Sequence, residues 1–252
     1  IGYQAADDYN PTADYGNCVF VGHQAGLNVS TARKATVIGN AAVGLGVMTG
    51  HENTVIGNEA GYDLTSGGNN TLMGVSAGGN LTIANHNTAV GLKALFEETI
   101  GNHTTAIGFN SLNKQLSNTD NEVTGNTAVG SYSGYYNVQG TENTIIGYEA
   151  GFGSSTYSHS NNTMIGHQAG KGILGGGSNT FVGDASGVAT TSGDDNVCVG
   201  KGAGRSLTSG DDNIIIGSGS DAAANDRSSV IVIGKDLESA ANNHARIGGA
   251  IF

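Results

Sequence analysis

Apolar and polar positions recur along this chain with a period close to 17 residues. The segments at 53–57, 143–147 and 162–166 all read Asn-Thr-apolar-Ile-Gly, and variants of this stretch occur throughout. With its Gly as an anchor there are fifteen anchors and fourteen intervals, nine of them 17 residues long. A fixed short interval of this kind is typical of repeat proteins. The anchors are Gly2, Gly22, Gly39, Gly57, Gly74, Gly91, Gly108, Gly130, Gly147, Gly166, Gly183, Gly200, Gly217, Gly234 and Gly248.

Each repeat predicts one coil of a solenoid. β-branched residues that end at a Gly indicate a short strand closed by a turn. A small residue recurs three places after the anchor, and Gly-bearing turn strings such as TSGDDN at 191–196 follow. We therefore predict an all-β fold, a parallel β-solenoid of about fifteen 17-residue coils, each with two short strands and two turns. Residues 1–234 would form the repeats, and residues 235–252 a divergent C-terminal coil or cap.

Both residues before the anchor are apolar in most repeats, and neighbouring strand residues point to opposite faces. One face can fill the coil, but the other has to be covered from outside. We expect an oligomer whose chains meet along this flank, rather than a single chain with a partly apolar side. Asn four places before the anchor and Thr three places before it should each stack on their copies in the next coil.

Composition narrows the class of protein. The 43 glycines and the low charged share of 12% do not suit a helical protein. The net charge of −11 argues against nucleic acid or an anionic membrane as a partner, and no run of 18 apolar residues predicts membrane insertion. Cys18 and Cys198 are expected to lie many coils apart and to remain unbridged.

The segments "NTVIGNEAG", "NTIIGYEAG" and "NTMIGHQAG" resemble the head repeats of trimeric autotransporter adhesins of the YadA type. They are even more similar to related repeats in bacteriophage tail fibres. This resemblance covers about residues 1 to 250 and implies a homotrimeric fibre outside the cell, on a virion or a bacterial surface. The longer 17-residue coil departs from the adhesin pattern, which leaves handedness and trimer packing open.

The two ends of the chain carry further expectations. The C-terminal stretch is similar to the segment before a self-cleaving intramolecular chaperone in many phage fibres, which would make Phe252 a mature end; the alternative is an ordinary boundary. Ile1 opens in mid-repeat without a cap, so we expect the sequence to be a piece of a longer chain.

No catalytic arrangement is evident, so we do not expect an enzyme. The string Ser-Gly-Asp-Asp-Asn occurs twice, one coil apart, and should bring four carboxylates close together. Such a cluster is either a solvated acidic turn or a Ca²⁺ site; no other cofactor is expected. The four residues are Asp194, Asp195, Asp211 and Asp212.

Departures from the 17-residue coil are the best candidates for recognition, since loops on a rigid scaffold usually carry binding. The largest insertion lies within residues 113–125, another includes Pro11, and a third spans 153–161. Tyrosines concentrate just after the first of these, where exposed rings with polar neighbours would suit sugars; packing between chains is the equal alternative. The predicted receptor-binding residues are Asn118, Asp120, Asn121, Glu122, Tyr135, Tyr136 and Tyr157.

The function expected from these features is a trimeric adhesive fibre that presents loops to a cell-surface glycan or protein and contacts other fibre or virion proteins. The alternatives are a bacterial adhesin head, a purely structural spacer, and a glycan-cleaving tailspike with a carboxylate pair between chains. An ice-binding solenoid is a weaker alternative, because the Thr ladder is expected to point into the coil.

Overall fold

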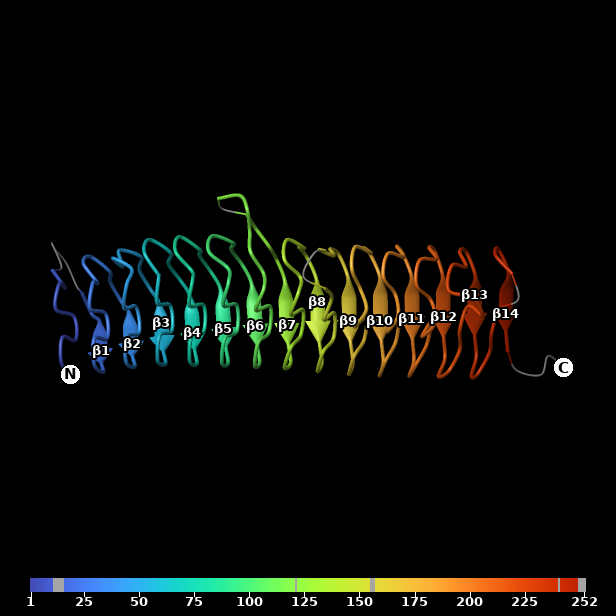
Figure 1. Ribbon diagram of the computed structural model, residues 1–252, viewed down its shortest axis with the longest axis horizontal. Helices are drawn as coiled ribbons and strands as arrows, with labels where there is room; N and C mark the ends of the chain where they lie inside the picture. The colour runs from blue at the N-terminus through green and yellow to red at the C-terminus, as the bar shows by residue number, and fades with distance from the viewer. Residues whose placement is uncertain (11–15, 121, 155–156, 240, 249–252) are drawn as a thin grey trace. The chain divides into compact units, whose positions relative to one another are not determined.

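The computed structural model describes residues 1–10, 16–120, 122–154, 157–239 and 241–248. They form two compact units, Ile1–Asn126 and Thr127–Phe252. The described residues of each unit are wound as a parallel β-solenoid and contain no helix, which confirms the predicted fold class (Figure 1). No segment there forms a helix that could cross a membrane. Pro11 and Phe252 lie outside the described residues.

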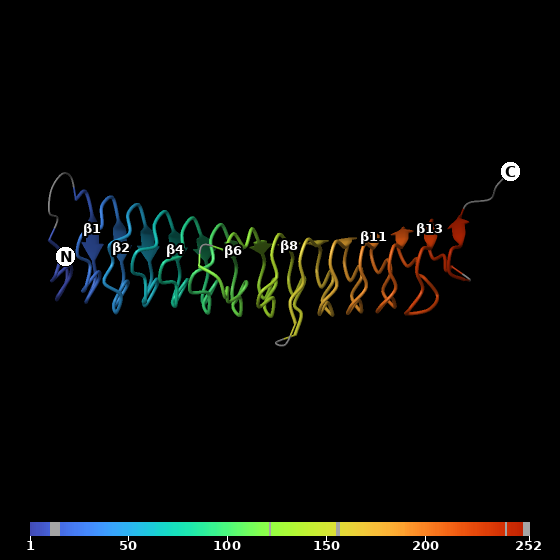
Figure 2. The same cartoon turned by 90° about the horizontal axis from the view of Figure 1, so that it is seen from above.

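Each strand consists of the three residues before an anchor Gly, and strands follow each other in sequence order along one side of the coils (Figure 2). The pairing is parallel and in register; Thr54, for example, pairs with Thr71. The first unit holds β1 (Val19–Val21), β2 (Thr36–Ile38), β3 (Thr54–Ile56), β4 (Thr71–Met73), β5 (Thr88–Val90) and β6 (Thr105–Ile107). The second holds β7 (Thr127–Val129), β8 (Thr144–Ile146), β9 (Thr163–Ile165), β10 (Thr180–Val182), β11 (Val197–Val199), β12 (Ile214–Ile216), β13 (Ile231–Ile233) and β14 (Ala245–Ile247).

Each described coil contains one strand, so the prediction of two strands per coil was wrong. The reason is a pair of left-handed residues beyond the anchor, such as Glu59 with φ 54° and Gly61 with φ 51°. A strand cannot remain extended through such residues. Backbone pairing between coils nevertheless continues there, since the N–H of Gly61 donates to the carbonyl of Ala77 at 3.0 Å.

The anchor itself has to be Gly because the backbones of successive coils meet there. Gly57 has φ +143°, and a Cβ at this position would lie 2.3 Å from the carbonyl oxygen of Gly74 in the next coil. No side chain can be accommodated at that distance. The same close approach explains why the anchor Gly recurs coil after coil.

From β2 to β13 the middle residue of each strand is buried in the coil, and its two neighbours point out. In β3, Val55 is fully buried with Ala60 and Leu64, whereas Thr54 and Ile56 are only half-buried. The expectation that Thr points inward was therefore wrong. Thr and the following Ile do share a face, as expected from the alternation of a strand, but it is the outer face of the sheet, which we call the outer sheet face.

The predicted Asn ladder is present and buried. The Oδ1 of Asn53 accepts hydrogen bonds from the backbone N–H of Asn70 at 2.9 Å and from its Nδ2 at 3.1 Å. The Nδ2 of Asn70 also donates to the carbonyl of Ala84 at 2.8 Å. The same pattern joins Asn162, Asn179 and Asn196 in the second unit. Each ladder side chain thus satisfies buried backbone groups of its turn.

Both cysteines are free, as predicted. Cys198 is the buried middle residue of β11, and burial raises the pKa of its thiol to about 12. Cys198 therefore acts as a small apolar side chain of the core.

Candidate functional site

The largest insertion, at 113–124, rises above the neighbouring coils of the first unit (Figure 1). Asn118 and Asp120 at its tip are exposed, and Glu122 is half-buried. The carbonyl of Glu122 accepts a hydrogen bond from the N–H of Asn102 at 2.8 Å, and the adjacent Val123 bridges to Asn102. Asn121 lies outside the described residues. The insertion thus presents an exposed tip on a paired base.

A buried carboxylate holds the base of this insertion. Glu98 is fully buried, and its Oε1 accepts hydrogen bonds from the N–H groups of Thr99 at 2.9 Å and Gly101 at 2.8 Å. Its Oε2 accepts from the hydroxyl of Ser117 at 3.0 Å and from the Nε2 of Gln115 at 3.3 Å. Glu98 therefore ties the coil to the insertion through hydrogen bonds to both of its carboxyl oxygens.

This anchoring changes one expectation from the sequence. The sequence predicts a loop on a rigid scaffold, and a surface loop can usually be shortened at little cost. Gln115, Ser117 and Thr124 are instead buried. Removing Gln115 and Ser117 would take hydrogen-bond partners away from the buried Glu98, so the insertion is part of its coil as well as a presented loop.

The tyrosine cluster of the second unit is packed on itself. The ring of Tyr135 stacks on that of Phe152, with centroids 5.4 Å apart and an interplanar angle of 10°. Tyr136 meets both rings edge-on, at 4.5 Å from Tyr135 and 5.2 Å from Phe152. Tyr135 and Tyr136 are therefore half-buried, not exposed as expected, because each covers the other's faces.

Tyr157 is separate from this cluster and is 51% exposed. The predicted receptor-binding residues are divided between the two units. Asn118, Asp120 and Glu122 belong to the first unit, whereas the three tyrosines belong to the second. Their role in binding stays a prediction.

The acidic turns repeat as expected, but two of their carboxylates are used by the backbone. Asp194 Oδ1 accepts from the N–H of Gly177 at 2.6 Å, and Asp211 Oδ1 accepts from the N–H of Asp194 at 2.9 Å. Asp195 and Asp212 are exposed and take the left-handed conformation. Within the described ranges, no group of three or more His, Cys, Asp or Glu side chains is arranged to hold a metal. The solvated turn accounts for these contacts, and calcium binding stays a hypothesis.

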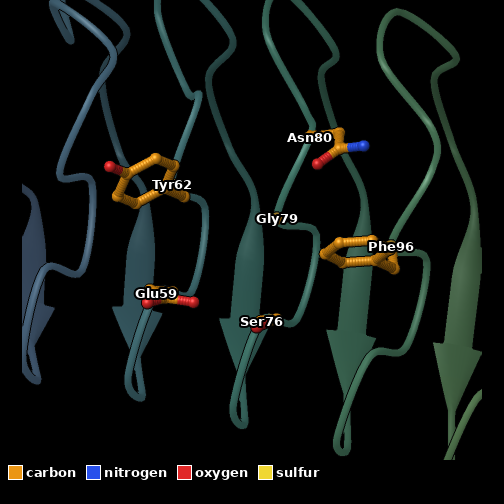
Figure 3. A pocket seen from close by; sticks show the side chains of 6 residues that line it. All are labelled: Glu59, Tyr62, Ser76, Gly79, Asn80 and Phe96. Carbon is orange, nitrogen blue, oxygen red and sulfur yellow. The ribbon is translucent and has the colours of Figure 1, made fainter.

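The first unit also contains a small cavity that was not predicted from the sequence. Its volume is about 270 Å³, and two aromatic rings, Tyr62 and Phe96, stand on either side of Gly79 (Figure 3). All three residues lie five places after an anchor, the position that Tyr135 and Phe152 occupy in the second unit. An aromatic-Gly-aromatic pattern in successive repeats was the available signal. The lining consists of Glu59, Tyr62, Ser76, Gly79, Asn80 and Phe96.

Comparisons with protein-family models, with curated proteins and with solved structures give no match for this chain.

Proposed function

We propose that this chain is part of an extracellular attachment fibre, a homotrimeric β-solenoid that presents surface features to a cell-surface glycan or protein. The single observation that supports it most is the outer sheet face. Two residues of every strand point to this face, and the second of them is Ile, Val or Met in every described strand. A partly exposed apolar stripe of this kind marks an interaction surface.

The stripe becomes more apolar toward the C-terminal end of the second unit. Thr occupies the first outward position from β7 to β10, and Val or Ile replaces it in β11, β12 and β13. In β12, Ile214 and Ile216 are 38% and 37% exposed. Burying these side chains against a second copy would contribute about 25 cal/mol for each Å² removed from water.

The number of three chains rests on the resemblance to YadA-type heads and phage fibres. Location on a virion or a bacterial surface, and contacts with other fibre proteins, are part of the same proposal. The role is binding rather than catalysis, since no catalytic arrangement is evident in the sequence.

Cell attachment tests this function. The fluorescently labelled chain should bind a panel of bacterial cells in a saturable manner, and unlabelled chain should compete. Absence of saturable binding to every cell type in the panel would leave the spacer alternative. Release of soluble saccharide from bound cells would instead support the tailspike alternative.

Ice binding is a second candidate. It was considered weak because the Thr side chains were expected to point into the coil, but they point outward. Thr36, Thr54, Thr71, Thr88 and Thr105 lie in register on the outer sheet face of the first unit. A regular row of hydroxyls and methyl groups on a flat sheet could order water. An ice-recrystallisation assay tests this directly, and a trimer that covers the face excludes it.

A further inference from the structure

The cavity beside Gly79 owes its shape to the spacing of two rings. Tyr62 and Phe96 hold the same repeat position two coils apart, and the coil between them has Gly there. At the spacing of neighbouring strands, two coils separate equivalent atoms by about 10 Å. A ligand ring that enters this interval can therefore contact both aromatic side chains.

The two rings are tilted in the same direction, so this interval is preserved. A Cβ at Gly44 would lie 2.7 Å from an edge carbon of Tyr62, and a Cβ at Gly79 would lie 2.8 Å from an edge carbon of Phe96. Each ring thus leans over the Gly of the preceding coil. The space between Tyr62 and Phe96 remains open because both lean alike.

The second unit shows the closed form of the same arrangement. Tyr135 and Phe152 hold this position in adjacent coils and stack directly at 5.4 Å. No ligand fits between rings at that distance. A residue that restored a ring at position 79 would therefore close the cavity.

Polar side chains line the cavity beside the rings. Glu59 is exposed, Asn80 is half-buried and Ser76 borders the cavity floor (Figure 3). Within the described part of the chain, none of these three side chains makes a hydrogen bond or ion pair. A carboxylate, an amide and a hydroxyl are thus free to accept and donate hydrogen bonds at the edge of a ligand ring.

We propose that this cavity, which we call the aromatic slot, binds one pyranose ring of a neutral saccharide between Tyr62 and Phe96. C–H groups of a pyranose contact the two aromatic rings, and its hydroxyls meet Glu59, Ser76 and Asn80. The volume suits one sugar ring, because pockets for larger ligands begin near 300 Å³.

Charge favours a neutral sugar. Glu59 lines the slot, and the chain carries a net charge of −11. Lys93, whose Nζ lies 5.2 Å from the centroid of the Phe96 ring, is not among the lining residues. An acidic sugar would meet repulsion from the Glu59 carboxylate, and none of the residues that line the slot is cationic.

The slot stays open when the outer sheet face is covered. Ala60 and Leu64, two places before and after Tyr62 in the sequence, are buried inside the coil, so Tyr62 points out of it. Figure 3 shows Tyr62 on the side of the coil that faces away from the strands. The outer sheet face lies on the opposite side of that coil. The role of the slot as a receptor subsite rests on the proposed function. Its ability to bind a sugar rests on the geometry of the cavity alone.

Saturation-transfer NMR on the full chain tests the proposal, with the methyl glycosides of glucose, galactose and N-acetylglucosamine as probes. We expect saturation of the ring C–H protons of at least one glycoside, with a dissociation constant in the millimolar range, as suits a single small ring. Glucuronic acid should give a weaker signal. Gly79→Tyr should close the slot and weaken binding at least tenfold, and Tyr62→Ala should do the same.

Phe152→Ala is the matched control, since it removes a ring from the same repeat position in the closed stack; it should leave the sugar signal unchanged. Circular dichroism checks that each variant is folded. Binding that persists in Gly79→Tyr, or no transfer to any glycoside, overturns the proposal. Transfer to indole but not to sugars would also overturn it, assigning the slot to an aromatic side chain of a protein partner.

Cell attachment is measured in parallel, so that the two proposals fail separately. Loss of attachment in Gly79→Tyr together with loss of sugar binding supports the slot as the receptor subsite. Sugar binding without any attachment by the unaltered chain supports the slot and contradicts the attachment function. Attachment that Gly79→Tyr leaves unchanged contradicts the slot's role in it.

Discussion

The outer sheet face and the row five places after the anchor differ in how strictly they repeat. The face shows an aliphatic side chain or Met before the anchor in every described strand. The row changes from coil to coil: Tyr62 is followed by Gly79, then by Phe96. A surface that repeats can pair with a copy of itself along its length, whereas a surface that varies can distinguish one place from another. Regularity therefore fits assembly, and irregularity fits recognition.

A charge on the regular face should have the largest effect. Ile216→Asp would place a carboxylate in the proposed interface of every copy, at a cost of more than about 3 kcal/mol for the assembly. Since Ile216 is 37% exposed in the isolated chain, each chain should remain folded. Sedimentation velocity should show monomers. Tyr157→Asp, at a 51% exposed site outside the sheet, is the control and should leave the assembly intact.

Removal of the Glu98 carboxylate tests how an irregular coil is held. Glu98→Ala would leave the N–H groups of Gly101 and Ser117 buried without their acceptor. We expect a loss of about 4 kcal/mol in the free energy of unfolding, measured with urea. Shortening the 113–124 insertion should destabilise the chain less when Glu98→Leu is introduced with it. Equal losses with and without Glu98→Leu would contradict the anchoring role.

The third insertion contains a pH-sensitive element. His159 is fully buried, its Nδ1 and Nε2 lie near Asn143 and the carbonyl of Gly151, and burial lowers its pKa to about 4. The unfolded chain takes up this proton near pH 6.5, but the folded chain does not until near pH 4. The stability from neutral His159 is thus complete above pH 6.5 and lost as pH falls toward 4, by about 3 kcal/mol.

Urea unfolding at a series of pH values checks this expectation. His159→Gln should flatten the decline between pH 6.5 and 4, and the exposed His51→Gln is the control. An unchanged pH dependence in His159→Gln would show that other groups cause the decline.

Substitution of one Asn in the buried ladder should have the smallest effect on stability, since each Asn contributes only a few of the hydrogen bonds that join neighbouring coils. Asn179→Ala removes the acceptor for the N–H of Asn196 and the donor to the carbonyl of Gly193. We expect a loss of about 2 kcal/mol by urea unfolding. The exposed Asn40→Ala should change stability by less than about 0.5 kcal/mol. Similar losses in both variants would mean that the ladder has no special role.

Strand positions could be predicted from the sequence because the backbone contact at the anchor admits only Gly. A recurring Gly therefore follows the end of every strand. The number of strands per coil could not, because left-handed residues such as Glu59 and Lys93 are not glycines and leave no compositional trace. The exposure of Tyr135 was misjudged for a similar reason: its cover, Phe152, comes from the next coil. Predicting the aromatic slot would have required knowing that the side chain five places after the anchor points outward.

The mass of the unaltered chain in solution tests the central claim, that the outer sheet face joins copies of this chain. The measurement is sedimentation equilibrium at micromolar concentration. The account predicts a single species of three times the 25.3 kDa chain mass, about 76 kDa. A stable monomer of 25.3 kDa would contradict it and leave the outer sheet face, with its row of Thr and Ile, open to solvent.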